Sequence, residues 1–360
     1  MHQSLRPYVT AGIAVLGAGM VAVTPVAAAS AVDIQPMPEV ALTAGVGLGD
    51  IDFTQAWTDA FDTAKDNFTA VQAAASDASS ALTDALKAAD FSTLDFNQLS
   101  AALTFLAGDQ KTFLNTLAPQ TMDDLHAVVY MVLTDPAGQL TGGEPALPED
   151  LLPLVNFAAS PLSGQLFAAL GPSISPMVAL INSFEAISAN LSGADGASPD
   201  VTAALQEMVN IPANMVNGML NGATFNLDAL APALEGAGLL PEGMGVDGIS
   251  LAFGGLLSPG SVAGVTDGGA GESLIGSVGG SIFNALGLNL TGVPLLDTLD
   301  LEPNGIGPLG AFAMMQNVLA QWLSGELPAL EPAEVDPGAG VADVDWLSGF
   351  DLGDLFGLSA

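Results

Sequence analysis

The chain has 360 residues, of which 39 are Asp or Glu and only 4 are Lys or Arg, so its formal net charge at pH 7 is -35. This charge excludes a nucleic-acid-binding protein, because such a protein needs a basic surface that releases counterions from phosphates. Hydrophobic residues make up 50% of the chain, which is enough to form a core and unlike the composition of a disordered acidic tail. The lack of cysteine excludes thiol nucleophiles, disulfides and cysteine-based zinc sites.

Residues 1–31 have the features of a secretory signal peptide. Arg6 precedes an apolar run over residues 8–23, and Pro25 is followed by small residues from Ala27 to Ala31. A basic start, an apolar run and a small-residue cleavage site are typical of exported proteins. An uncleaved N-terminal anchor is the alternative. Residues 32–49 are interpreted as a flexible leader, because their GVGLG run lacks the strand and the spacing of a dinucleotide-binding motif.

Residues 50–135 are predicted to form an amphipathic helical bundle. From Phe53 to Leu86 the apolar residues recur every three or four positions, with Trp57, Phe61 and Phe68 among them. This spacing indicates a helix with one apolar face, close to a heptad seam. We therefore expect the aromatic residues of this seam to pack against neighbouring helices.

Two further helices are expected in the same bundle. The pattern continues over residues 99–117 until Pro119 ends it. Thr121 then begins a sequence that resembles a capping box, and an apolar stripe follows over residues 125–132. Short connections between helices that share apolar stripes favour packing into a bundle.

Residues 136–330 are predicted to form an apolar helical domain interrupted by glycine and proline. Long stretches carry no charge, such as those between Asp150 and Glu185, Asp247 and Asp267, and residues 272 and 297. Each approaches the length of a membrane span, but prolines and glycines interrupt all of them. Two interpretations stay open: short buried helices in a globular core, or a surface that inserts into an outer lipid layer.

The fold class expected from these patterns is mainly α, and no transmembrane β-barrel is expected. A barrel needs many strands with alternating polarity and girdles of Trp and Tyr, whereas the sequence has 3 Trp and 2 Tyr. Residues 331–360 are interpreted as an acidic linker followed by an apolar C-terminal segment that contains Trp346, Phe350 and Phe356. We expect this segment to dock on the core.

The distribution of charge limits the ion pairs of the chain. No Lys or Arg follows Lys111, so the later carboxylates must face water, cap helices or bind cations weakly. Asp200, for example, precedes a predicted helix. Weak binding of divalent cations is therefore expected, although Asp50 and Asp52 lack the other ligands of an EF-hand loop.

The tests for catalytic residues give no candidate site. After the signal region, His126 is the only histidine, and no G-x-S-x-G motif accompanies it. We interpret it as a structural residue beside an apolar helix stripe. The sequence therefore predicts that the protein is not an enzyme and has no catalytic, cofactor-binding or metal-binding residues.

Three segments resemble a known family of exported proteins. They are LRPYVTAG at residues 5–12, GDIDF at 49–53 before the Trp57 helix, and NIPANMVNGMLNG at 210–222. They resemble the GjpA-type outer membrane porin family of mycobacteria and related mycolic-acid bacteria, over nearly the whole chain. The resemblance implies export to the mycolate cell envelope and a channel role.

Two functions are kept open on these grounds. The first is an exported envelope protein that contacts outer-membrane lipid or cell-wall components and assembles as a homo-oligomer into a cation-favouring channel, whose acidic walls would repel anions. The second is a secreted soluble helical protein that binds an apolar ligand or a cell-wall partner.

Overall fold

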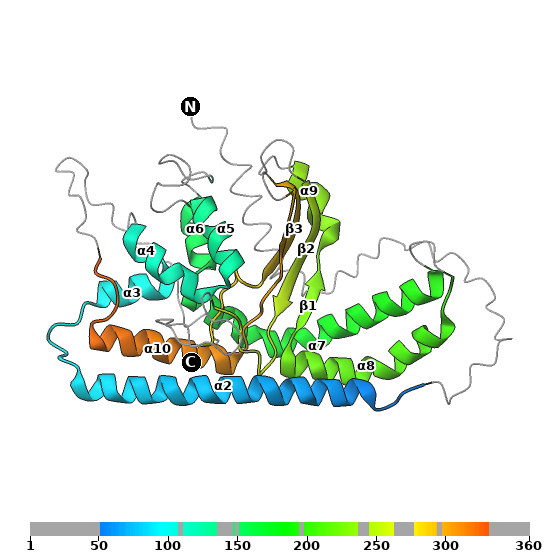
Figure 1. Ribbon diagram of the computed structural model, residues 1–360, viewed down its shortest axis with the longest axis horizontal. Helices are drawn as coiled ribbons and strands as arrows, with labels where there is room; N and C mark the ends of the chain where they lie inside the picture. Colours follow the sequence, from blue (N-terminus) through cyan, green and yellow to red (C-terminus); the bar gives the residue numbers. More distant parts are fainter. Residues whose placement is uncertain are drawn as a thin grey trace, which may run out of the picture. The chain divides into compact units, whose positions relative to one another are not determined.

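The structure is a computed structural model that describes residues 51–106, 111–134, 147, 151–193, 198–236, 245–262, 277–293 and 297–330 (Figure 1). The expected signal peptide (1–31), leader (32–49) and C-terminal segment (331–360) lie outside these residues. All the described residues belong to one unit of the chain, residues 48–360.

The described residues are mainly helical, which confirms the predicted fold class. The helices, with two short 3-10 turns, are α2 (Gln55–Ala88), α3 (Phe96–Thr104), α4 (Lys111–Leu117), η2 (Ala118–Thr121), α5 (Asp124–Thr134), α6 (Leu152–Ala158), α7 (Pro161–Ser192), α8 (Val201–Asn221), η5 (Asp228–Leu230), α9 (Ala231–Gly236) and α10 (Pro308–Ser324).

Side-chain caps define where several helices begin. The Asp200 carboxylate accepts a hydrogen bond of 2.9 Å from the backbone N–H of Ala203, so it caps α8 as the sequence predicts. At α5 the cap is Asp123, which accepts from the N–H groups of Leu125 and His126. The capping box expected to start at Thr121 is therefore wrong, because the Thr121 hydroxyl donates to carbonyl oxygens instead.

A four-stranded antiparallel sheet, which the sequence analysis did not predict, lies within the later apolar region. Its strands are β1 (Ala223–Asn226), β2 (Gly245–Phe253), β3 (Leu286–Val293) and β4 (Asp297–Leu301), in the order β1-β2-β3-β4. Phe225 pairs with Leu251, and Leu290 pairs with Leu299. Among the described strands the sheet is open, with β1 and β4 at its edges. The expectation of helices alone over residues 245–301 is thus corrected.

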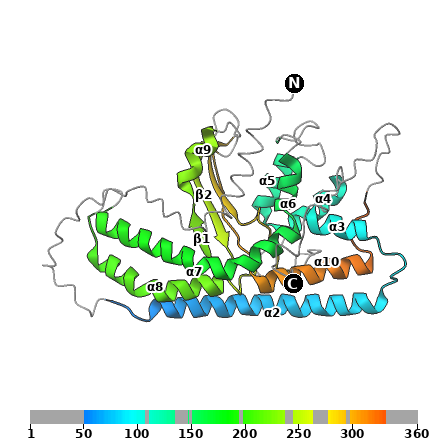
Figure 2. The ribbon, with the colours of Figure 1, turned by 180° about the vertical axis from the view of Figure 1, so that it is seen from behind.

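The core joins helices that lie far apart in the sequence. Helix α2 packs along α10 and α8, as both views of the ribbon show (Figures 1 and 2), and α10 also contacts α7 and α3. The main cluster of buried side chains includes Phe105 and Phe113 from the first region and Met314 and Trp322 from α10. These contacts join residues on both sides of position 135, where a boundary between two helical regions was expected from the sequence.

Candidate functional site

Helix α7 carries a stripe of exposed apolar side chains, with the exposed Ser173 and Ser188 on the same face. At 100° per residue, its members fall within an arc of about 80° on the helix surface. The fractional exposure of these side chains ranges from 38% to 57%; they are Leu166, Leu170, Met177, Ile181, Phe184 and Leu191. We call this set the α7 stripe.

The α7 stripe is long and has no charged member. From Leu166 to Leu191 it extends about 38 Å along the helix axis, compared with about 30 Å for the hydrocarbon core of a bilayer. Among the described helices, α7 alone is long and apolar enough to cross a membrane by length and composition, with a mean hydropathy of 1.4 over 18 residues. Glu185 is the only charged residue of this helix.

The opposite side of α7 is buried by small residues that bring backbones close together. A Cβ atom at Gly171 would lie 2.1 Å from the carbonyl oxygen of Gly254, just after β2. On α8, a Cβ atom at Gly218 would lie 2.7 Å from the carbonyl oxygen of Ser175. Larger side chains cannot occupy these positions without moving the backbone. One side of α7 is therefore fixed against protein, and the α7 stripe is the side left exposed.

Two other helices also expose their large apolar residues. On α2, Phe61 and Phe68 are 54% and 49% exposed, while small residues such as Ala64 and Ala78 are buried. The expectation that these phenylalanines pack against neighbouring helices is therefore wrong. On α5 the expected stripe is likewise turned outward: the exposed side chains are Leu125, Val128 and Val132, and the buried ones are His126, Ala127, Tyr130 and Thr134.

His126 is buried, with both ring nitrogens engaged. Its side chain is on α5, where Nδ1 lies 2.7 Å from Oδ2 of Asp123 and Nε2 lies 2.7 Å from the carbonyl oxygen of Leu286 at the start of β3. A general base must reach a proton of the substrate, and this ring is 1% exposed. The arrangement links α5 to the sheet.

A buried polar network surrounds the His126 ring. The side-chain N–H of Asn304 donates to Oδ2 of Asp123 at 2.7 Å. The backbone N–H of Asp123 donates to Oδ1 of Asn284 at 2.8 Å, and Asn284 is fully buried. Each of these groups is paired with protein, so the network holds the first region against the loops of the sheet.

The described residues contain no group of three or more His, Cys, Asp or Glu side chains that could hold a metal ion. Comparisons of the chain with protein-family models, with curated proteins and with solved structures gave no match.

Proposed function

We propose that the chain is a non-enzymatic exported protein of the cell envelope that is held at an outer lipid layer by the α7 stripe. The observation that carries this proposal is the charge-free row of six exposed apolar side chains. The signal-peptide pattern of residues 1–31 and the resemblance to the GjpA-type outer membrane porin family support the same compartment.

The geometry of α7 favours a helix that lies in the lipid surface over one that crosses it alone. A single-span helix must offer lipid an apolar surface all round, but one side of α7 packs on α8 and the sheet. A one-sided stripe fits a helix that lies in the plane of the interface with its apolar face in the acyl region.

The negative charge of the chain limits which lipid headgroups it can bind. A chain with a formal net charge of -35 is repelled by anionic headgroups. Binding must therefore come from apolar area, and neutral lipid surfaces are the expected partners. We further propose that several copies of the chain assemble into a channel that favours cations.

Vesicle flotation tests lipid binding directly. The chain recovered from the producing cells should float with neutral phosphatidylcholine vesicles, and the double variant Met177→Asp/Phe184→Asp should bind at least about 30-fold more weakly, because two half-exposed apolar side chains contribute about 2 kcal/mol together. The control Thr69→Asp/Ser80→Asp adds the same two charges to exposed polar positions of α2, about 80° and 100° round the helix from the exposed Phe61, and should float like the wild type. Failure of the wild type to float, or equal flotation of the stripe variant, would contradict the proposal.

The alternative is a secreted soluble protein with a cell-wall partner. This alternative would be supported if the chain is recovered from the culture fluid as a monodisperse monomer and does not float with vesicles. One structural feature favours a polar partner over an apolar ligand: the hollow between α2 and α8, whose walls carry amides and carboxylates.

A further inference from the structure

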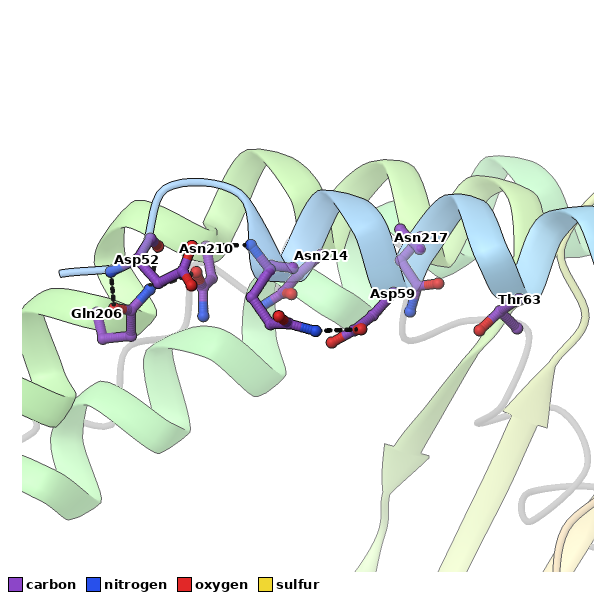
Figure 3. A pocket seen from close by; sticks show the side chains of 10 residues that line it. Asp52, Asp59, Thr63, Gln206, Asn210, Asn214 and Asn217 are labelled. Atoms are coloured by element: carbon purple, nitrogen blue, oxygen red, sulfur yellow. Dashed lines mark hydrogen bonds between the residues drawn. The ribbon is translucent and has the colours of Figure 1, made fainter.

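A polar groove lies between the first turns of α2 and the middle of α8. Figure 3 shows its labelled side chains in a row where the two helices run side by side. Its volume of about 490 Å³ lies within the range of about 300–1,000 Å³ that is usual for small-molecule sites. We call it the carboxamide groove.

Both walls of the groove carry a row of polar side chains, and Ala56 and Ala60 of α2 complete the lining. The α8 wall consists of Gln206, Asn210, Asn214 and Asn217; their spacings of four, four and three residues place them on one helix face. The α2 wall includes Gln55, Asp59 and Thr63, again four residues apart. All four α8 carboxamides are half-buried.

Hydrogen bonds between α8 and the α2 region close the two ends of the groove. At one end, Oε1 of Gln206 accepts from the backbone N–H of Asp52 at 2.8 Å, and its Nε2 donates to the Asp52 carbonyl oxygen at 2.6 Å. At the other end, Nδ2 of Asn221 donates to the carbonyl oxygen of Ala60 at 2.8 Å. The distance between the helices is thereby fixed, and the groove is preformed.

The middle of the groove leaves polar atoms without a protein partner. Asn210 and Asn217 each accept one hydrogen bond on Oδ1, from Gln206 and Asn221 respectively, and Asn214 donates through Nδ2 to Glu207 and Ser183. Among the described residues, no hydrogen bond engages Nδ2 of Asn210, Oδ1 of Asn214 or Nδ2 of Asn217. A donor, an acceptor and a donor therefore follow one another along α8. None of these atoms is among the buried atoms that lack a partner, so they face water, which the polar groups of a ligand can replace.

The lining selects a class of ligand. It contains no Lys, Arg or His, so an anion would meet carboxylates with no compensating charge. An apolar ligand would cover the amide groups and Asp59 without offering them hydrogen bonds. Hydroxyl groups both donate and accept, which matches an alternating row of amide donors and acceptors with Asp59 and Thr63 opposite. We propose that the carboxamide groove binds a neutral saccharide.

Isothermal titration with the full chain tests this site without any lipid, so its outcome is independent of the lipid proposal. The probes are maltotriose, cellotriose and mannotriose, with glucose 6-phosphate as the anionic comparison. At least one neutral trisaccharide should bind, and the phosphorylated sugar should not. Failure of all three trisaccharides to bind up to their solubility limits, or equal binding of the phosphorylated sugar, would overturn the inference.

Two variants locate the binding. Asn217→Leu removes one of the two free amide donors of α8, together with the oxygen that accepts from Asn221. Thr63→Phe fills the groove from an exposed position of α2 without removing any α8 carboxamide. Each should weaken binding by about tenfold or more, equivalent to the loss of about 1.4 kcal/mol. The matched control Gln72→Leu removes an exposed carboxamide of α2 outside the groove and should bind like the wild type. Binding that is unchanged in a folded Thr63→Phe variant would place the saccharide elsewhere and overturn the inference.

Discussion

Nδ1 of His126 lies 2.7 Å from Oδ2 of Asp123, the residue that caps the helix on which the histidine stands. The other ring nitrogen, Nε2, lies 2.7 Å from the carbonyl oxygen of Leu286. A carboxylate and a carbonyl oxygen are both acceptors, so each ring nitrogen faces an acceptor. The Asp123–His126 pair thus caps the start of α5 and attaches this helix to the sheet.

The stability that Asp123 supplies should depend on pH. Burial raises the pKa of Asp123, but the hydrogen bonds that its carboxylate accepts from His126 and Asn304, together with the charge of His126, outweigh burial and lower the pKa below 3.8. A carboxyl group whose pKa is lower in the folded state stabilises the fold above its unfolded pKa, and this contribution is lost as the pH falls through the folded value.

We therefore expect Asp123→Asn to lower the free energy of unfolding at pH 7 by about 1–3 kcal/mol. The difference from the wild type should shrink as the pH falls below about 4. Urea unfolding at a series of pH values measures both effects. Asp66→Asn, at an exposed position of α2, serves as the control and should change stability by less than about 0.5 kcal/mol. A difference that persists unchanged at the lowest pH would contradict the assignment.

Tyr130 should ionise only when the chain unfolds. It is fully buried on α5, and its hydroxyl donates to Oδ1 of Asn156 at 2.8 Å. Burial raises the pKa of Tyr130 well above the usual 10.0, although its hydrogen bond with Thr134 opposes this. A group of this kind stabilises the fold fully below pH 10, and the contribution is lost as the pH rises toward the folded pKa.

The measurement is an alkaline titration of phenolate absorbance together with circular dichroism. The chain has 2 tyrosines, and Tyr8 lies in the expected signal peptide, so the mature chain reports on Tyr130 alone; Tyr8→Phe serves the same purpose in a chain that keeps residues 1–31. Phenolate absorbance should rise in the same pH interval as the helical signal is lost. Ionisation near pH 10 in a chain that is still folded would show that the ring is accessible to water.

Sequence periodicity predicted the presence of α2 and α5 but not which side of each is buried. Apolar residues at spacings of three and four define a helix wherever its partners lie. The buried side depends on α8 and α10, which are distant in the sequence, and they pack against alanines such as Ala64 and Ala78 in preference to Phe61 and Phe68. The exposed aromatic side chains could therefore be found only from the tertiary structure.

The sheet and the groove were missed for different reasons. Strand β3 is rich in Leu and Gly, and β2 contains two glycines, so neither has the β-branched composition that signals strands. The carboxamides from Gln206 to Asn217 were visible at helical spacing, but polar residues on a helix ordinarily face water. Only the contact between α2 and α8 places them in a groove.

Glycine at position 171 should be essential for packing α7 against the loop after β2. The added methyl group of Gly171→Ala would meet the Gly254 carbonyl oxygen, and overpacking of this kind costs about 1–3 kcal/mol. Gly236→Ala at the end of α9 is the matched control, because a Cβ atom there meets nothing within 4 Å. Thermal unfolding should show a clear loss for the first variant and little change for the second. Equal melting temperatures would mean that the backbones can separate without cost.

The channel form of the proposed function predicts the sign of ion selectivity. The chain has 39 acidic and 4 basic residues, so any water-filled path between copies has anionic walls, which concentrate cations and repel anions. In planar bilayers under a potassium chloride gradient, the reversal potential should lie toward the value for potassium. The preference should fall as the pH approaches about 4, where exposed carboxyl groups take up protons. A mock purification from cells that lack the chain is the control. Conductance no greater than in that control, or a preference for chloride, would count against the channel. The lipid-binding proposal is tested separately, by vesicle flotation.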